Sequence, residues 1–284
     1  MDRRAFLKFT GATLTLNTVC GIPEAVYAGR ELARRTTHRE PASDNGVKDR
    51  LVKSLLFDHH FRDDVILSGL ELDLLKSSLA RLKRIQRLIG YGNFCLAGFD
   101  DALAYAKSYV RVGRFSKAEL EFLEKVFYSP ANAYGFMGEK PIDRMTVRIR
   151  KKKTVKIPRT GNYLYKGKPV RMYGDIKKKI GPDVVLTSGI RGVMKQFLLF
   201  LNKAAQSRGN LSMASRSLAP PGYSFHGTGD FDVGEKGFGI DNFTEKFTQT
   251  RVYNQLSDLG YIKFRYDREN DLGVRFEPWH VEVA

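Results

Sequence analysis

The pattern of apolar and polar residues divides the chain into a helical first half and a mixed second half. Between residues 51 and 128, apolar residues recur at intervals of three and four, which gathers them on one side of an α-helix. The predicted helices cover residues 70–90, 99–110 and 115–128. The first carries the longest apolar stripe: Leu72, Leu75, Leu79, Leu82, Ile85 and Ile89. The third opens with Ser116 and Glu119 at the spacing of a capping box.

After Tyr173 the pattern changes to short strands separated by helices. We predict strands over residues 182–189, 261–266 and 274–283, a turn-rich strand pair over residues 223–234, and helices over residues 193–205 and 244–260. Strands that alternate with helices, with hairpin-like pieces near the end, indicate an α+β fold. The predicted fold is therefore a C-terminal α+β domain with a small antiparallel sheet flanked by helices, preceded by an all-helical region. The predicted segments are an export signal (1–28), a polar linker (29–50), a helical accessory domain (51–140) and the α+β domain (150–284).

The N-terminus has the features of an export signal. Arg3 and Arg4 precede a short apolar stretch, and small residues follow at Val26 and Ala28. The apolar stretch is shorter than the roughly 20 residues that span a bilayer, so we expect no integral membrane span in the mature protein. The paired arginines are similar to the twin-arginine class of signals. This predicts an exported protein, periplasmic or associated with the cell wall; the alternative is a basic amphipathic helix that the mature protein keeps.

Charge and cysteine content limit the partners and the sources of stability. The formal net charge is +17, which predicts attraction to a polyanion. For an exported protein we expect anionic cell-wall polymer or phospholipid rather than nucleic acid, and no nucleic-acid motif is present. The densest basic run, residues 148–159, reads as an exposed strand or hairpin, either solvated or in contact with anionic polymer. Removal of the signal would take away Cys20 and leave Cys95 alone, so no intramolecular disulfide is expected.

The C-terminal sequence RFEPWHVEVA holds the first candidate chemistry. Glu277 and His280 lie three residues apart, with Pro278 and Trp279 between them. Proline interrupts regular strand pairing, so it can direct both side chains into one cleft. Trp279 would form part of the cleft wall or fix the local backbone. The His59-His60 pair is weaker as a metal site, because adjacent residues point to different faces of a helix, and we interpret it as surface or packing.

A zinc hydrolase needs three protein ligands, an open position for water and a carboxylate that is not a ligand. The best upstream candidates are His226 and Asp232, which lie on either side of two glycines in the stretch SFHGTGDFDVG. Together with His280 they form a His, Asp, His set, and Glu277 would serve as the general base. Asp230 is an alternative to Asp232 as the ligand.

At these residues the chain resembles the D-alanyl-D-alanine carboxypeptidases of the vancomycin-resistance type, zinc peptidases of the superfamily that includes lysostaphin-type peptidases and the hedgehog domain. The family motifs are Ser-x-His-x-x-Gly-x-Ala-x-Asp, then Glu-Pro-Trp-His, and earlier Ser-Gly-Tyr-Arg-Ser followed by Gln. The matching residues are Ser188, Gly189, Arg191, Gln196, Ser224, His226, Gly229, Asp232 and Glu277 to His280. The resemblance covers roughly residues 170–284.

The resemblance implies a role for each matching side chain. His226, Asp232 and His280 would bind Zn²⁺, and Glu277 would be the catalytic base. Arg191 would hold the terminal carboxylate of the substrate. Substrate contacts would also come from Ser224, Gln196 and Trp279.

Two departures from the family pattern affect the site. The chain is one residue shorter between Gly229 and the aspartate, and Phe231 replaces or displaces the usual alanine. Ile190 and Gly192 replace Tyr and Ser around Arg191, so the substrate pocket is expected to differ.

The resulting hypothesis is a zinc peptidase that acts on peptidoglycan stem peptides, with D-alanyl-D-alanine carboxypeptidase activity as the first expectation. The alternatives are an endopeptidase that cuts peptidoglycan cross-links, and a non-catalytic cell-wall-binding module with a structural zinc ion.

Overall fold

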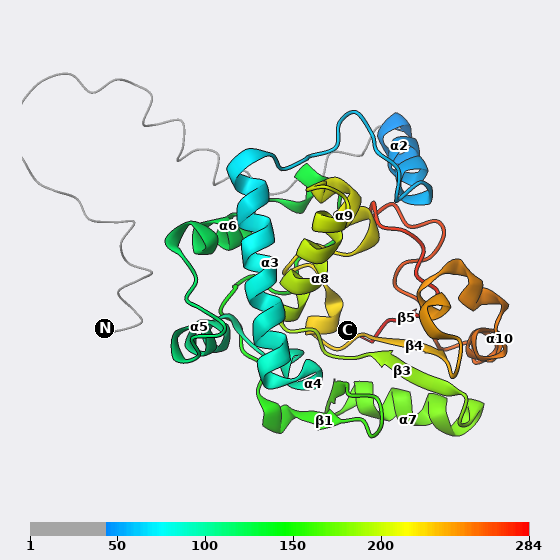
Figure 1. The fold of residues 1–284 in the computed structure, drawn as a ribbon. Helices are drawn as coiled ribbons and strands as arrows, with labels where there is room; N and C mark the ends of the chain where they lie inside the picture. The colour runs from blue at the N-terminus through cyan, green and yellow to red at the C-terminus, as the bar shows by residue number, and fades with distance from the viewer. Residues whose placement is uncertain (1–43, 284) are drawn as a thin grey trace, which may run out of the picture. The chain divides into compact units, whose positions relative to one another are not determined.

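The structure, a computed structural model, describes residues 44–283. The predicted export signal and the first part of the predicted linker lie outside these residues. Figure 1 shows helices gathered around α3 and α8 on one side and a small sheet with its own helices on the other. This mixture of helices and small antiparallel sheets confirms the predicted α+β fold class.

The first half of the described chain is helical, as its apolar pattern predicts. Its helices are α2 (Asp44–Leu55), α3 (Gly69–Ile89), α4 (Tyr91–Phe94), α5 (Phe99–Ser108) and α6 (Lys117–Tyr128). The buried side of α3 includes Leu75, Leu79, Leu82 and Ile85 from the predicted stripe. The capping box at the start of α6 is confirmed: the Glu119 backbone N–H donates to Ser116 Oγ at 3.1 Å, and the Ser116 N–H donates to the Glu119 carboxylate at 2.8 Å.

The second half contains the strands and the remaining α-helices. In chain order these elements are β1 (Thr154–Lys156), β2 (Tyr163–Tyr165), α7 (Lys168–Ile180), β3 (Val184–Ser188), α8 (Val193–Gln206), α9 (Leu211–Ser217), β4 (Phe231–Glu235), α10 (Arg251–Asp258) and β5 (His280–Val281). Strands β1 and β2 form an antiparallel hairpin. The strand or hairpin predicted from the basic run at residues 148–159 is thus confirmed only for β1, because Lys151–Lys153 before it form a 3-10 turn and β2 lies beyond the run.

Three antiparallel strands in the order β3-β4-β5 form the sheet that carries the site. In this sheet Asp232 pairs with Ser188 of β3 on one side and with His280 of β5 on the other. Residues directly opposite each other on neighbouring strands point to the same face. The register therefore brings Asp232 and His280 together, although they lie 48 positions apart in the sequence.

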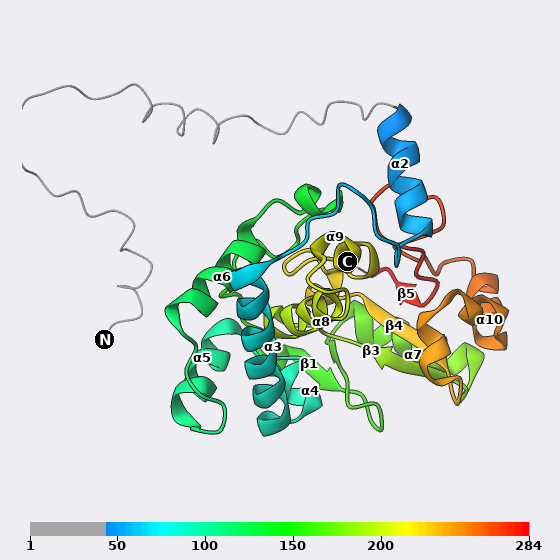
Figure 2. The ribbon, with the colours of Figure 1, turned by 45° about the horizontal axis from the view of Figure 1, so that its top comes forward.

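Among residues 44–283, the two larger of three hydrophobic cores pack the helices and this sheet. The larger core combines α3 and α6 with α8, so the predicted helical region and the start of the α+β region pack around shared side chains such as Leu82, Phe127 and Phe197. The second core joins α7 and α10 to the sheet through residues such as Ile176, Phe231 and Trp279. Figure 2 shows α7 beside β3, with which it is in contact. The site lies where these two cores meet the sheet.

Several predicted elements are shorter in the structure than the sequence pattern suggested. The strand pair predicted over residues 223–234 is a 3-10 turn (Phe225–Gly227) followed by β4. The strand predicted over residues 261–266 forms only an isolated bridge at Phe264. Of the final predicted strand only β5 pairs, because Pro278 has no N–H and the His280 N–H bonds back to the Glu277 carbonyl at 3.1 Å.

Two helix boundaries also differ from the predictions. The helix predicted over residues 244–260 becomes a 3-10 helix (Glu245–Gln249) and then α10, because the Thr250 side chain accepts a hydrogen bond from the Tyr253 N–H and starts a new helix. Residues 44–50 of the predicted linker form the first turns of α2. Among residues 44–283, no helix has both the length and the apolar character that a membrane crossing requires.

Candidate metal centre and active site

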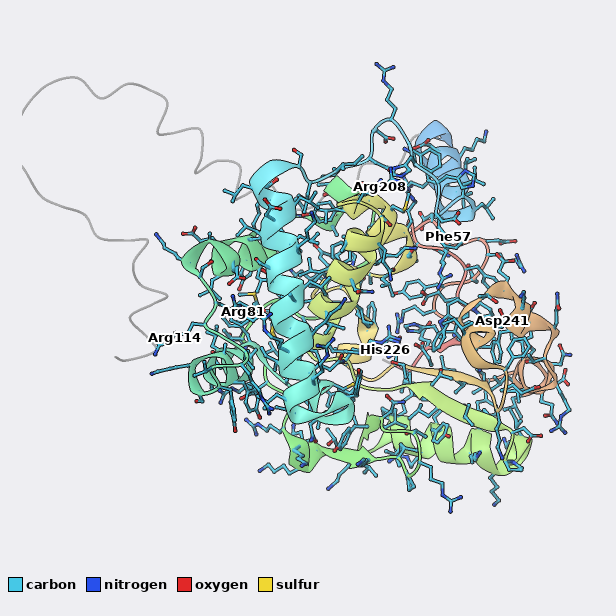
Figure 3. All side chains as sticks on the ribbon, in the orientation of Figure 1. Phe57, Arg81, Arg114, Arg208, His226 and Asp241 are labelled. Atoms are coloured by element: carbon cyan, nitrogen blue, oxygen red, sulfur yellow. The ribbon has the colours of Figure 1, made fainter. Side chains whose placement is uncertain are left out.

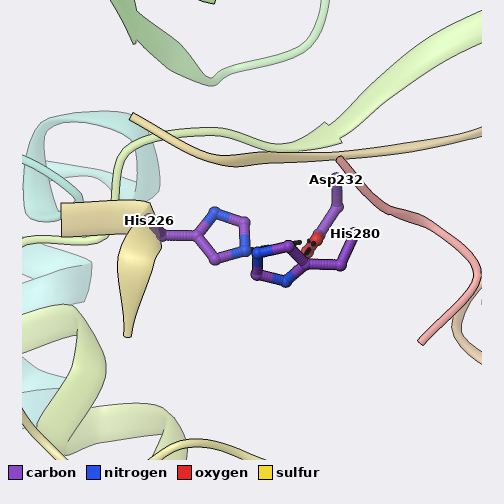
Figure 4. A group of neighbouring side chains, drawn as sticks. All are labelled: His226, Asp232 and His280. Atoms are coloured by element: carbon purple, nitrogen blue, oxygen red, sulfur yellow. Dashed lines mark hydrogen bonds and ion pairs between the residues drawn. The ribbon is translucent and has the colours of Figure 1, made fainter. Parts of the chain in front are cut away.

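Three side chains converge at the edge of the three-stranded sheet. His226, Asp232 and His280 each present one ligand atom, and these atoms all lie within 4.8 Å of one another. Figure 4 shows the two imidazole rings and the carboxylate directed at one another. All three residues are buried. Within residues 44–283 this is the only group of three or more His, Cys, Asp or Glu side chains with such geometry.

The two strands and one turn position these side chains. Asp232 and His280 lie opposite each other on β4 and β5, and the Asp232 Oδ1 is 3.5 Å from the His280 Nδ1. His226 comes from the 3-10 turn that precedes β4, and its Nε2 is 3.1 Å from the same Asp232 oxygen. Figure 3 places His226 in the interior, between the helices around α3 and the sheet.

The orientation of His226 is fixed by a backbone carbonyl. Its Nδ1 lies 2.8 Å from the Gly189 oxygen, so Nδ1–H donates there and leaves the Nε2 lone pair directed at the cluster. Position 189 must be glycine, because a Cβ there would lie 2.1 Å from the Tyr163 carbonyl oxygen. The glycine of the Ser-Gly-x-Arg motif thus serves the geometry of His226.

His280 is held from the opposite side of its ring. Its Nε2 lies 3.0 Å from the Asp230 Oδ2, which fixes Nε2 as the protonated nitrogen and leaves Nδ1 facing Asp232 and His226. The buried Nδ1 has no hydrogen-bond partner. A buried nitrogen without a partner is costly, and a metal ion at this point would satisfy it. Two imidazole nitrogens and a carboxylate oxygen are also a donor set that suits Zn²⁺.

This arrangement bears on the choice between Asp230 and Asp232 as a ligand. Asp232 contacts both imidazoles on the side where their free nitrogens meet. Asp230 instead contacts the far nitrogen of His280 and the Val283 N–H, which donates to its Oδ1 at 2.8 Å. The geometry therefore favours Asp232 as the ligand and Asp230 as a partner of the ligand His280.

Glu277 lies beside the cluster without belonging to it. Its Oε2 is 3.3 Å from the His280 Nδ1, and the residue is 6% exposed. Its backbone N–H donates to the Tyr266 carbonyl at 2.9 Å, which holds the turn before β5 in place. A carboxylate so placed can accept a proton from a molecule that sits in the centre of the group.

Arg191 approaches the cluster from the loop after β3. Its Nη2 forms an ion pair with the Asp232 Oδ2, and its Nε donates to Ser188 Oγ at 2.9 Å. Gln196 fixes this loop: its Nε2 donates to the Arg191 carbonyl at 2.8 Å, and its Oε1 accepts from the Gly222 N–H at 2.8 Å. Gln196 therefore positions the backbone that carries Arg191.

Three of the predicted substrate-binding residues share a small cavity. Arg191, Gln196 and Ser224 line a space of about 20 Å³ together with apolar side chains of α8 and the segment after α9. Such a volume holds about one water molecule. Trp279, by contrast, is 2% exposed and packs edge-on against Phe243 in the second core. Trp279 thus fixes the backbone between Glu277 and His280, the second of the two roles expected for it.

Burial and charge pairing shift the pKa values of the three clustered side chains in different directions. Burial lowers the pKa of His226, and the Arg191 charge lowers it further. Burial alone would raise the pKa of Asp232, but His226 and the Arg191 guanidinium hold it well below its usual range. Burial opposes the charged form of His280, yet the adjacent carboxylates of Asp230 and Glu277 raise its pKa to about 9. The site thus favours an ionised aspartate beside a neutral His226.

Sequence reasoning missed two groups that hold the site. Arg265 binds Asp230 through an ion pair, and its guanidinium lies 3.6 Å from the centre of the Phe225 ring. Tyr266 is 3% exposed and packs edge-on against His280, with ring centroids 5.0 Å apart. Both residues fell in a segment predicted as a strand, and no spacing in the sequence links them to positions 225 or 280.

Comparison with known proteins agrees with the motifs. Residues 170–283 match the family model described as VanY, D-alanyl-D-alanine carboxypeptidase. This stretch contains every residue of the candidate site described above, and the match confirms the resemblance predicted from the motifs. A search of the curated proteins found no match.

Solved structures of related enzymes give partial matches. The LdcB LD-carboxypeptidase, whose structure concerns peptidoglycan recognition, is 25% identical, with 45% of this chain and 62% of that chain covered and a TM-score of 0.37. A mutant of the vancomycin-resistance D,D-pentapeptidase VanY from a VanB-type cassette, in complex with Zn(II), is 20% identical, with 49% and 84% covered and a TM-score of 0.34. VanYB in complex with D-alanine-D-alanine is 19% identical, with 52% and 84% covered and a TM-score of 0.37. The chain thus spans less than two thirds of the length of the first of these proteins.

Proposed function

We propose that this protein is a zinc-dependent peptidoglycan peptidase, and that its reaction is the removal of the terminal D-alanine from stem peptides. The observation that carries the proposal is the convergence of His226, Asp232 and His280, with the Glu277 carboxylate 3.3 Å from His280. The family match over residues 170–283 supports a carboxypeptidase. The Zn(II) and D-alanine-D-alanine complexes described for related proteins name the same metal and substrate class.

His226 would hold the metal through Nε2, His280 through Nδ1, and Asp232 through Oδ1. Zn²⁺, when bound, would supply Lewis acidity toward the scissile carbonyl and lower the pKa of a water molecule. The hydrogen bonds from His226 to the Gly189 carbonyl and from His280 to Asp230 would keep both rings in the correct tautomer. Arg191 would hold the second oxygen of Asp232 and thereby restrict how that carboxylate turns.

Glu277 would accept the proton of the attacking water and pass it to the leaving amine. At 6% exposed, the Glu277 side chain is largely shielded from bulk solvent. Arg191 has a guanidinium that can also receive a substrate carboxylate, because a planar two-pronged donor matches a carboxylate. Ser224 lines the same small cavity as Arg191 and would contact the same end of the substrate.

The family match also motivates where the protein acts. Peptidoglycan lies outside the cytoplasmic membrane, so the predicted export signal at residues 1–28 and a periplasmic or wall location fit the proposed substrate. The net charge of +17 would raise the rate of encounter with anionic wall polymer.

The decisive test replaces Glu277 by Gln, which keeps the size of the side chain and removes its basicity. We expect E277Q to bind zinc as the wild type does and to lose hydrolysis of a pentapeptide stem by at least about 100-fold, the contribution of a general base. Metal content by elemental analysis and D-alanine release by mass spectrometry give the two readouts. Full activity in E277Q would remove Glu277 from its role.

The same digestion separates the alternatives. Free D-alanine from purified wall supports the carboxypeptidase, whereas cleaved cross-linked dimers support an endopeptidase. Zinc binding and wall binding without either product support a non-catalytic module with a structural zinc ion.

A further inference from the structure

We propose that Asp230 and Arg265 form a positioning pair that orients His280 for metal binding. The proposal rests on the proposed zinc site, and it concerns two residues that the family motifs do not specify. Asp230 lies in the stretch between Gly229 and Asp232, which is one residue shorter than in the family pattern. In the structure this aspartate faces the nitrogen of His280 that points away from the cluster.

Asp230 is held so that its carboxylate cannot easily turn away. Its Oδ2 accepts from the His280 Nε2–H at 3.0 Å, and its Oδ1 accepts from the Val283 N–H at 2.8 Å. The residue is 1% exposed. A buried carboxylate with a fixed donor at each oxygen determines the ring orientation and tautomer of the histidine that it contacts.

Arg265 supplies the charge that allows Asp230 to remain ionised in the interior. Its Nε pairs with the Asp230 Oδ2, and its Nη2 donates to the Oδ1 at 3.3 Å. The Arg265 N–H also donates to the His280 carbonyl at 3.2 Å, so the backbone of the positioned residue and the guanidinium are tied together. An isolated buried carboxylate is costly, whereas one paired with a guanidinium is retained.

The face of the Phe225 ring fixes the guanidinium itself. The Arg265 guanidinium carbon lies 3.6 Å from the centre of that ring, a stacking arrangement that favours the planar cation. Phe225 directly precedes His226. The turn that carries one proposed ligand therefore supports, through Arg265 and Asp230, the orientation of another.

The test measures zinc affinity, which an unrelated structural role would leave unchanged. We expect Asp230→Asn to weaken zinc binding by about 10- to 100-fold, the usual effect of losing the carboxylate behind a ligating histidine. Arg265→Gln should weaken it in the same direction. The control Asp241→Asn removes a carboxylate that pairs with Lys246 away from the site, and should leave the affinity as in the wild type. Chelator competition on the full chain gives the dissociation constants, and circular dichroism shows whether each variant is folded.

The imidazole nitrogens of His280 give a second, independent readout. In ¹⁵N-labelled, zinc-loaded wild type we expect the proton of His280 on Nε2, and in zinc-loaded Asp230→Asn a mixture of tautomers. A folded Asp230→Asn variant with wild-type zinc affinity would overturn the proposal. If that variant does not fold, Arg265→Gln carries the test, and an unchanged affinity there overturns it.

The outcome also separates this proposal from the proposed function. A wild type that binds no zinc overturns both. Zinc binding that depends on Asp230, in a protein that releases no D-alanine from stem peptides, would overturn the reaction and support the positioning pair.

Discussion

Removal of the Asp64 carboxylate should destabilise the protein strongly, because Asp64 pairs with Arg216 in the interior. The Arg216 Nη1 donates to the Asp64 Oδ1 at 2.6 Å and Nη2 to the Oδ2 at 3.0 Å, and the side chains are 5% and 2% exposed. Asp64 also accepts from the Asn210 side chain at 2.7 Å. Breaking a buried pair by deleting one partner costs about 3–5 kcal/mol. For a domain of this size that lowers the Tm by about 6–20 °C, at about 2–4 °C per kcal/mol.

Backbone hydrogen bonds connect the Asp64–Arg216 pair to the segment that carries Glu277. Arg216 lies on α9, and its carbonyl accepts from the Arg275 N–H at 2.9 Å, two residues before Glu277. Its guanidinium also donates to the His59 carbonyl at 2.8 Å. The pair therefore ties the segment after α2 to the segment that carries the proposed base, and we expect its loss to destabilise both together.

Thermal unfolding followed by circular dichroism tests this prediction on Asp64→Ala. The double variant Asp64→Leu/Arg216→Met should be less destabilised than the single variant, because no buried charge is left alone. The control Glu121→Ala, which breaks an exposed pair with Lys117, should change the Tm little. A Tm of Asp64→Ala equal to that of the control would refute the reasoning.

The pH dependence of unfolding offers a further check on the same pair. Burial opposes ionisation of Asp64, but the hydrogen bonds from Arg216 and Asn210 lower its pKa below the usual value. A carboxyl with a lowered folded-state pKa contributes stability above its unfolded pKa and loses it as the pH falls through the folded one. Asp64→Asn should therefore show a smaller loss of stability on acidification than the wild type.

Two further predictions concern local contacts. Gly189→Ala should lose about 1–3 kcal/mol of stability, because the new Cβ would lie 2.1 Å from the Tyr163 carbonyl oxygen. It should also weaken zinc binding, because it would displace the Gly189 carbonyl that orients His226. The matched control is Gly174→Ala on α7, where a Cβ meets nothing within 4 Å, and equal unfolding curves for the two variants would contradict the prediction. Cys95 is 6% exposed, and burial raises the pKa of its thiol. In a Cys20→Ser chain this thiol should therefore react slowly with a thiol reagent at pH 8 and quickly in denaturant. Fast labelling of the folded protein would show that the thiol is accessible and would contradict the prediction.

The helical part of the fold could be predicted well from local pattern. The stripe of α3 and the capping box of α6 are properties of neighbouring residues, and a helix satisfies its backbone within its own segment. Strand lengths were predicted less well. A strand exists only where a partner pairs with it, and the residues before β5 bond in a turn instead.

The sequence by itself also determined which residue types could form the site. Two histidines, an aspartate and a glutamate in family motifs were enough to select His226, Asp232, His280 and Glu277 as candidates. The tertiary structure decided how these side chains lie relative to one another. Strand pairing set Asp232 opposite His280, and so distinguished Asp232 from Asp230, which lies only two positions away.

The supporting groups depended on the fold alone. Arg265 lies 35 residues from Asp230, and no periodicity connects them. Their contact exists because β4 and β5 pair and bring the preceding segments together. Local spacing determines helices and motifs, since those interactions are short in sequence, whereas burial, tautomer and the partners of each charge are fixed only when distant segments pack.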